Sequence, residues 1–241
     1  MRIFGVKPAM EALRAGRVTA LAVSARRQRG LAALLELADS RRVRPRWVER
    51  AELDRLAGGA AHQGVVASVR APDSCSVADL LAVRTPPLVV VLDGIEDPRN
   101  LGAIARTVDA AGGSGLVVPE RRAAPVTGSA VKASAGALVH VPVARVVNLV
   151  RALEELKAAG VWTIGLDAEA DTSLYELDLR LPSAFVVGRE GQGLHRLARE
   201  RCDWRAALPM RGQVASLNAS VAVGVALFEA VRQRTGVTRP G

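Results

Sequence analysis

Three segments of the sequence place polar residues and glycines directly after short apolar runs, where they could bind a ligand. The segments are DGIEDPRNLGAIARTVDAAG (93–112), FVVGREGQGL (185–194) and LPMRGQVASLNASVAVGVALFEA (208–230). In open α/β sheets, ligands bind at the carboxyl ends of the strands. The three segments are therefore candidates for parts of a ligand site.

The first and third segments each have a structural explanation as well as a functional one. Asn100 could cap a helix, and Arg106, about two turns further on, could be a solvated helical residue. Ser216 and Asn218 are well placed to cap a final helix, because their side-chain oxygens accept hydrogen bonds from free backbone N–H groups. The same polar groups could instead hold a ligand. Taken singly, each of these two segments favours the structural explanation.

The second segment is a glycine-rich loop that surrounds Glu190. Gly188, Gly191 and Gly193 permit positive φ angles and a close approach of the backbone to a ligand, although a tight structural turn needs the same freedom. The loop is not GxGxxG, and no Walker A sequence occurs in the chain. The usual phosphate-binding fingerprint of a nucleotide-dependent oxidoreductase is therefore missing.

The composition is that of a globular protein with one or two domains. The chain has 241 residues, of which 49% are hydrophobic and 24% charged. No apolar run reaches the roughly 20 residues that span a bilayer, and the first residues lack a signal-peptide core. Two cysteines, Cys75 and Cys202, fit a reducing compartment. We expect a cytoplasmic protein without a membrane partner, and the widely separated His62, His140 and His195 predict no metal site.

The positive charge is concentrated in the first part of the chain. Residues 1–71 contain 14 Lys and Arg against 6 Asp and Glu, whereas residues 72–241 contain 19 against 18. Genomic base composition could explain the preference for arginine, but it does not explain this asymmetry. A basic module suits a polyanion, most often nucleic acid. Because Phe4 and Trp47 are its only aromatic residues, RNA recognition should depend on phosphates and shape.

The basic module alternates between helical and strand patterns, which predicts a small α/β sandwich. We expect helices over 5–16, 30–40 and 50–59, and strands over 19–25, 45–49 and 64–70. Residues 72–87 contain three prolines and a short helical piece, which is typical of a linker. The predicted domains are therefore 1–71 and 88–241, joined by 72–87.

The second part repeats buried apolar runs and helical patterns, which predicts an α/β domain with a parallel sheet and helices on both faces. Strands are expected over 88–94, 115–120, 139–144, 161–167 and 184–188, with a short apolar segment at 205–210. Helices are expected over 100–111, from Thr127 or Ser129 to Ala137, over 148–160 and over 217–232.

In this order and at these spacings, the three segments resemble the signature motifs of the SpoU (TrmH) family of RNA ribose 2′-O-methyltransferases. The resemblance covers about 85–235. The basic module, including HQGVVASV (62–69), is similar to the L30e-like RNA-binding domain of the family members that act on ribosomal RNA. The stretch KASAGALVHVPVARVVNL (132–149) is similar to the same ribosomal RNA branch.

The resemblance implies an α/β trefoil-knot fold, a homodimer, and S-adenosylmethionine (AdoMet) bound in the knot loops. By motif position, the residues expected to line the cofactor pocket are Gly188, Glu190, Gly193, Leu208, Pro209, Met210, Ser216, Leu217 and Asn218. The residues expected to serve catalysis are Arg106, Asn100, Glu190, Ser216 and Asn218. The backbone groups of Leu208 and Leu217 would bind the adenine.

The implied reaction is methylation of a ribose 2′-hydroxyl, with a guanosine of 23S rRNA as the expected target. Such a reaction needs the hydroxyl and the methyl donor held in line, and it needs the hydroxyl proton removed. A guanidinium stays protonated in proteins, so Arg106 is expected first to grip a phosphate and orient the ribose. The rRNA would also contact the dimer surface. A tRNA ribose methyltransferase, a resistance-type rRNA methylase and a non-catalytic RNA-binding or ribosome-assembly protein remain alternatives.

Overall fold

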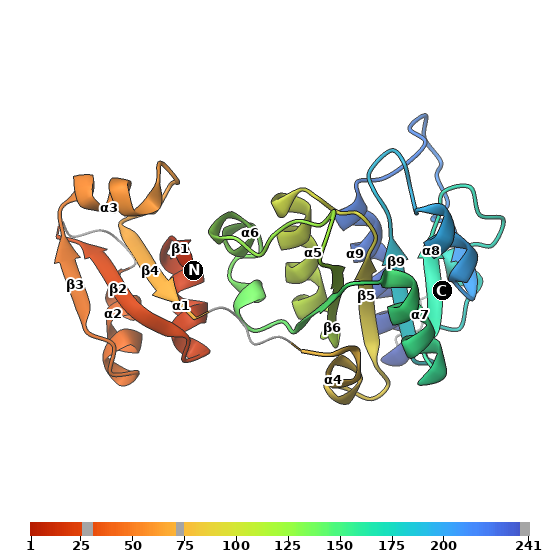
Figure 1. The fold of residues 1–241 in the computed structure, drawn as a ribbon, viewed down its shortest axis with the longest axis horizontal. Helices are drawn as coiled ribbons and strands as arrows, with labels where there is room; N and C mark the ends of the chain where they lie inside the picture. The colour runs from red at the N-terminus through yellow and green to blue at the C-terminus, as the bar shows by residue number, and fades with distance from the viewer. Residues whose placement is uncertain (26–30, 71–74, 237–241) are drawn as a thin grey trace. The chain divides into compact units, whose positions relative to one another are not determined.

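The backbone divides into two units that do not follow the chain in simple succession. The computed structural model describes residues 1–25, 31–70 and 75–236. Unit 1 consists of residues 1–73 and 125–140, and unit 2 of residues 74–124 and 141–241 (Figure 1). Segment 125–140 thus belongs with the basic module, although it was expected in the second domain. Of the sequence predictions, Gly30 and residues 72–74 lie outside the described residues.

Unit 1 is built on a mixed four-stranded sheet in the order β1-β4-β2-β3. β4 is antiparallel to β1 and β2, whereas β2 and β3 are parallel. Its elements are β1 (Arg2–Phe4), α1 (Val6–Arg14), β2 (Val18–Ser24), α2 (Leu31–Ser40), β3 (Pro45–Val48), α3 (Arg50–Ala57), β4 (Val65–Val69), α6 (Gly128–Ala133) and the 3₁₀ helix η1 (Ala137–Val139). The predicted helices and strands are confirmed, but the sequence analysis missed the short β1.

Segment 125–140 completes unit 1 through a close backbone approach at Gly128 and a side-chain hydrogen bond from Lys132. A Cβ on Gly128 would lie 2.3 Å from the carbonyl oxygen of Arg2 in β1. The Lys132 ammonium donates to the carbonyl oxygen of Ala61 at 2.6 Å. Thr127 caps α6 as predicted, by accepting from the N–H of Ala130. Unit 1 is therefore assembled from two separate stretches of chain.

The predictions for this segment were wrong in two details. The helix expected to reach Ala137 ends at Ala133, because Ala135 and Gly136 adopt positive φ angles of 53° and 103° and turn the chain into η1. The strand expected over 139–144 begins only at Val143, since η1 takes up Val139.

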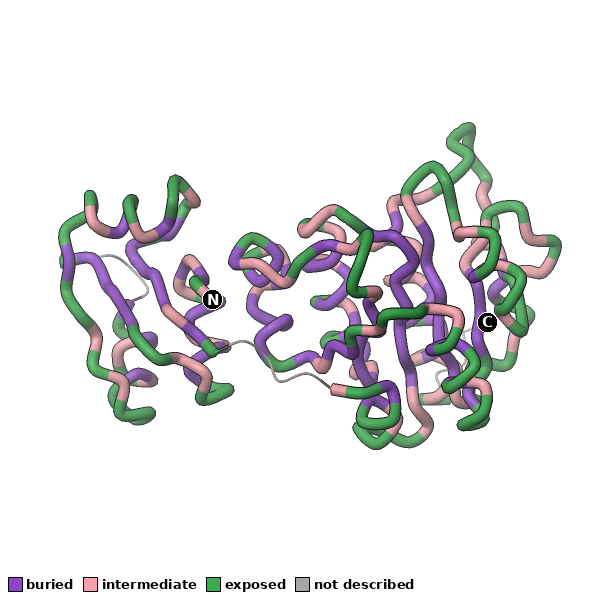
Figure 2. Tube along the Cα trace, in the orientation of Figure 1, coloured by how far each residue is buried: buried purple, intermediate pink, exposed green. Residues whose placement is uncertain are grey.

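Unit 2 contains a six-stranded sheet in the order β10-β8-β9-β5-β6-β7 with every pair parallel, as predicted. Every residue of β5 and β9 is buried, as Figure 2 shows for the strands at the centre of this unit. Its elements are α4 (Val77–Ala82), β5 (Leu88–Leu92), α5 (Pro98–Ala110), β6 (Gly115–Pro119), β7 (Val143–Val146), α7 (Leu149–Ala158), β8 (Trp162–Leu166), the 3₁₀ helix η2 (Leu174–Glu176), β9 (Ser183–Val187), α8 (Arg196–Arg201), β10 (Trp204–Ala206) and α9 (Ala219–Arg234).

The helices of unit 2 cover both faces of its sheet. Alternate strand residues, such as Val89 and Val91, pack with α4, α7 and α8 in one core. Residues between them point to the opposite face, because side chains alternate along a strand. α5 and α9 pack against each other, and α9 also packs on β9. Neither face of the sheet is therefore free for a ligand, which leaves the ends of the strands.

Helix boundaries follow the caps that the sequence offers. Asp97 caps α5 by accepting from the N–H of Arg99 at 2.8 Å, and Pro98 occupies the first turn, so the helix starts two residues before Asn100. Asn148 caps α7 as expected. None of the described helices is long and apolar enough to cross a membrane.

The predicted linker 72–87 contributes a structural element to unit 2. α4 begins at a capping box formed by Ser76 and Asp79. Its Leu80 is fully buried, in the same core as Val117 and Leu153. The prolines at the end of this stretch made it look like a connector, but its apolar residues belong to the core.

The replacement Leu80→Ala should lower the free energy of unfolding by about 2–5 kcal/mol, because it removes a fully buried side chain and leaves a cavity. Val83→Ala, at a residue with 52% of its surface exposed, should change it by less than about 0.5 kcal/mol. Urea unfolding of both variants measures the difference. Equal stability of the two would mean that α4 is a connector after all.

Candidate active site

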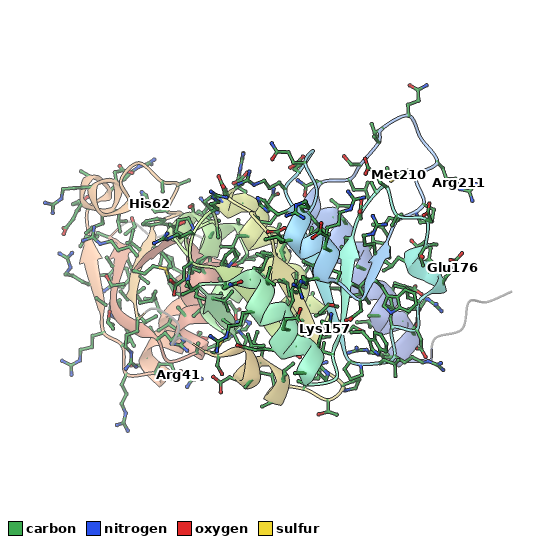
Figure 3. The ribbon with its side chains drawn as sticks, turned by 45° about the vertical axis from the view of Figure 1, so that its right-hand side comes forward. Arg41, His62, Lys157, Glu176, Met210 and Arg211 are labelled. Carbon is green, nitrogen blue, oxygen red and sulfur yellow. The ribbon has the colours of Figure 1, made fainter. Side chains whose placement is uncertain are left out.

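A cavity of about 450 Å³ opens at the carboxyl ends of β8, β9 and β10. Its walls come from residues 166–169 after β8, from the loop 187–194 after β9, and from residues 206–222 after β10. Figure 3 labels Met210 and Arg211 on the loop between β10 and α9. The residues expected at the cofactor pocket that line the cavity are Gly188, Glu190, Gly193, Leu208, Met210, Ser216 and Leu217.

Two of the expected cofactor residues do not line the cavity. Pro209 is exposed and its neighbours Leu208 and Met210 line the wall instead. Asn218 lies just behind the wall as the N-cap of α9. Ser216 lines the cavity but does not cap the helix, so the expected shared capping role belongs to Asn218 alone.

The glycine-rich loop is folded too tightly to accept side chains at one of its glycines. A Cβ on Gly188 would lie 2.0 Å from the carbonyl oxygen of Gly193. The loop is closed by Arg189 and Gly193, which exchange two backbone hydrogen bonds of 2.9 Å and 2.8 Å. The loop is therefore the tight turn that the sequence allowed and also a wall of the cavity, while its contact with a ligand stays a prediction.

The side chain of Asn218 joins the three segments singled out in the sequence. Its Oδ1 accepts from the N–H of Ser220 at 2.9 Å and so caps α9. Its Nδ2 donates to Oδ1 of Asn100 and to Oε2 of Glu190, both at 3.1 Å. A carboxylate, an amide and a helix end from distant parts of the chain thus meet beside the cavity.

Arg106 lies on α5, six residues after Asn100, and its side chain is exposed. Among the residues that the structure describes, it has no hydrogen-bond or ion-pair partner, and it does not line the cavity. The neighbouring Thr107 faces α9 beside Gly224. The cation is therefore available to a ligand that approaches from solvent.

The sequence analysis missed a charged group, Asp167, in the cavity wall that follows β8. Asp167 follows β8 and pairs with Arg199 at 3.0 Å and with Arg205 at 3.3 Å. The rule that found the other loops, polar residues directly after a buried strand, would have found Asp167 too.

The thiol of Cys202, at the end of α8, is not activated as a nucleophile. Burial, with the negative charges of Asp203 and Asp93, raises the pKa of the Cys202 thiol to about 12. The thiol therefore stays protonated and is a poor nucleophile. Within the described ranges, no group of three or more His, Cys, Asp or Glu could hold a metal ion.

Two family models match the chain, and together they span most of it. The model of the SpoU rRNA Methylase family matches residues 87–228. The model described as RNA 2′-O ribose methyltransferase substrate binding matches residues 2–75.

Individual relatives agree with the family models. The 23S rRNA (guanosine-2′-O-)-methyltransferase RlmB of Pseudomonas syringae is 46% identical over 211 residues, which cover 86% of this chain and 84% of that protein. The SpoU methyltransferase AviRb of Streptomyces viridochromogenes, crystallised with AdoMet, has a TM-score of 0.82 and 30% identity, covering 98% of this chain and 91% of its own. A TrmH/SpoU tRNA modifying enzyme of A. aeolicus has a TM-score of 0.58 and 32% identity, covering 66% of this chain and 81% of its own.

The match to the methylase model spans the candidate site. The methylase model covers the cavity together with Asn100, Glu190 and Asn218, the three residues that the Asn218 amide brings together. With this agreement and the similarity to RlmB and AviRb, the chain belongs to the SpoU rRNA methylase family.

Proposed function

We propose that this protein transfers a methyl group from AdoMet to the ribose 2′-hydroxyl of a guanosine in 23S rRNA. The observation that carries the proposal is the Asn218 amide, which ties Asn100 and Glu190 together at the edge of a ligand-sized cavity. The identity to RlmB of Pseudomonas syringae, over most of both chains, supports the substrate.

The cavity has the size and lining that AdoMet requires. Its volume of about 450 Å³ falls in the range of roughly 300–1,000 Å³ found for small-molecule sites. Leu208, Met210 and Leu217 provide an apolar lining for the adenine. Gly188 and Gly193 lie in backbone contact, so the loop presents bare main chain to the cavity at its two closing glycines. When bound, AdoMet supplies a methyl group already activated by its sulfonium.

We assign Arg106 to the RNA. Its guanidinium is exposed, and five N–H donors suit it to grip the phosphate next to the target ribose. Holding the ribose in one orientation places its 2′-hydroxyl in line with the methyl group of AdoMet, which lowers the entropic cost of the reaction. Glu190 and Asn218 keep the cavity loop and the start of α9 in shape. Loss of the 2′-hydroxyl proton then depends on the positive charge and the hydrogen bonds that Arg106 places next to the ribose.

We infer that unit 1 is an L30e-like module that docks rRNA through phosphates. Arg41, Arg42 and Arg44 form an exposed basic turn after α2, and Figure 3 shows Arg41 pointing away from the protein. Contacts of this kind give salt-dependent binding. The match of residues 2–75 to a substrate-binding model supports this role.

We also propose that the protein is a homodimer with a trefoil knot in unit 2. Family membership supports the knot. Support for the dimer comes from α9, where Val221 and Phe228 are each 49% exposed and Val225 lies between them on the same helix face. Exposed apolar side chains in a row are typical of an interface. The RNA would then contact surfaces of both copies.

The alternative is methylation of tRNA by the same site. The A. aeolicus tRNA modifying enzyme matches 66% of this chain by structure. RlmB of Pseudomonas syringae is 46% identical over 86% of this chain, and this identity favours rRNA. Methylation assays with purified 23S rRNA and with tRNA separate the two. Activity on tRNA alone contradicts the proposal, and failure to bind AdoMet would favour a non-catalytic RNA-binding protein.

We place the reaction in the cytoplasm, where rRNA is available.

Arg106→Ala should lower kcat by about 10²–10⁴-fold, the range for a residue that orients or deprotonates the reacting group. AdoMet affinity should not change, because Arg106 does not line the cavity. A methylation assay and calorimetry measure the two quantities. Arg99→Ala, on the same helix and paired with Asp97 at the surface, is the control. Equal loss of turnover and cofactor affinity in Arg106→Ala contradicts the assignment.

Changing Arg41, Arg42 and Arg44 together to Gln should weaken rRNA binding. The plot of log affinity against log salt concentration should become shallower by about one for each phosphate that the variant no longer binds. Filter binding over a range of salt concentrations measures this slope. Substitution is preferable to deletion of residues 1–71, because deletion would strip segment 125–140 of its partners.

The control for that experiment removes the same charge from unit 2. Arg151, Arg180 and Arg196 are exposed and paired with acidic neighbours. Their replacement by Gln should leave the salt slope nearly unchanged. If both triple variants lose affinity equally, the basic turn of unit 1 has no special role.

Phe228→Glu should shift the protein from dimer to monomer, since it places a charge in the proposed apolar interface. The monomer should stay folded, because half of the Phe228 surface is exposed already. Sedimentation at several concentrations measures the change. Leu197→Glu, at an equally exposed residue of α8, should leave the association unchanged. A dimer that persists in Phe228→Glu places the interface elsewhere.

A further inference from the structure

The loop that carries Glu190 is a small closed hairpin with little packing of its own. Arg189 and Gly193 close it through their backbone hydrogen bonds, and Gly191, Gln192 and Gly193 are exposed. The hairpin forms a wall of the cavity. Besides the hydrogen bond between Asn218 and Glu190, the contacts at its two ends fix its position.

The C-terminal end of the hairpin is held by a buried carboxylate. Asp93, directly after β5, is only 6% exposed. Its Oδ2 accepts from the backbone N–H of His195 at 2.7 Å, and its Oδ1 lies 2.8 Å from Nδ1 of the same residue. Both carboxylate oxygens are thus used by one residue, and because Oδ1 is an acceptor, Nδ1 carries the proton.

The N-terminal end is held by an ion pair with the same short stretch of chain. A guanidinium nitrogen of Arg189 lies 2.9 Å from Oε1 of Glu96. Gly94, with a φ of 80°, lies between the two contacts. A Cβ there would be 2.8 Å from Nε of Arg189 and 2.9 Å from Cε1 of His195. Only glycine lets both side chains cross this point.

We propose that the pairs Asp93–His195 and Glu96–Arg189 form a clasp whose residues position the Glu190 hairpin for AdoMet binding. This proposal rests on the proposed function. The clasp fixes the hairpin to residues 93–96, and this stretch leads into α5 and Asn100. Glu190 is thereby held within 3.1 Å of Asn218, which contacts Asn100 at the same distance. Asp93, His195 and Glu96 lie outside the cavity lining and are positioning residues, because they act through the hairpin, whereas Arg189 both pairs with Glu96 and forms part of the cavity wall.

The clasp predicts that its disruption affects the affinity for AdoMet more than it affects kcat. A loop that is already ordered binds its ligand without the cost of ordering it. Breaking one pair of the clasp should therefore weaken AdoMet binding, while an enzyme saturated with AdoMet should keep most of its rate. The reacting groups themselves are untouched by the change.

The test compares His195→Leu with His195→Asn. His195→Leu should raise the Kd for AdoMet about tenfold, the effect of removing a hydrogen bond to a charged group, and lower kcat at saturating AdoMet by less than about threefold. His195→Asn should restore the Kd to within about threefold of the wild type, because its amide nitrogen is bonded to Cγ as Nδ1 is. Calorimetry and a methylation assay provide both quantities.

Arg196→Leu is the matched control, since Arg196 is the next residue, lies outside the cavity wall and pairs only with Glu200 among the described residues. It should bind AdoMet as the wild type does. The clasp is overturned if His195→Leu also binds normally, or if His195→Asn is as impaired as His195→Leu. If the wild-type protein binds no AdoMet, the proposed function fails instead.

The second pair gives an independent result that does not depend on how well the His195 variants fold. Glu96→Arg and Arg189→Glu should each weaken AdoMet binding, because each places like charges together. The double variant restores an opposite pair and should recover most of the affinity. A double variant no better than the single ones means that the two side chains do not act as a pair, and overturns this half of the clasp.

Discussion

The arrangement of the site depends on a single side-chain amide. An asparagine amide has two N–H donors and one carbonyl oxygen, and Asn218 uses all of them. The oxygen caps α9, and the nitrogen donates to Asn100 and Glu190, which are 118 and 28 residues away in sequence. The parallel sheet makes this meeting possible. Because β9 lies between β5 and β8 and runs in the same direction, the loops after all three strands emerge at one edge. Helices occupy both faces of the sheet, so that edge is the place left for a ligand.

Unit 1 is constrained by the path of the chain, which enters it twice. Segment 125–140 leaves unit 2 after β6 and returns to it before β7, and it packs into unit 1 in between. Gly128 fixes it there by lying against the backbone of β1, and Lys132 does so by donating from its ammonium to the carbonyl oxygen of Ala61. The basic unit and the unit with the cavity are thus connected by three passages of the chain.

Local sequence determined much of this molecule. The apolar runs specified the buried strands of unit 2, and caps such as Thr127 and Asn148 determined where helices begin. The concentration of arginine marked unit 1 as basic. These features depend on neighbours within a few residues, so they can be predicted without knowing the fold. Two of the three polar segments line the cavity, and the first reaches them through the hydrogen bond between Asn100 and Asn218.

Only the tertiary structure decided which of these groups touch. The contact between Asp93 and His195 joins residues 102 positions apart, and neither lies in a local pattern that points to the other. Leu80 looked like part of a connector until the sheet provided a core for it. Whether a polar residue caps a helix, binds a neighbour or faces a ligand depends on what the folded chain brings within about 3 Å, because hydrogen bonds act over no longer distance.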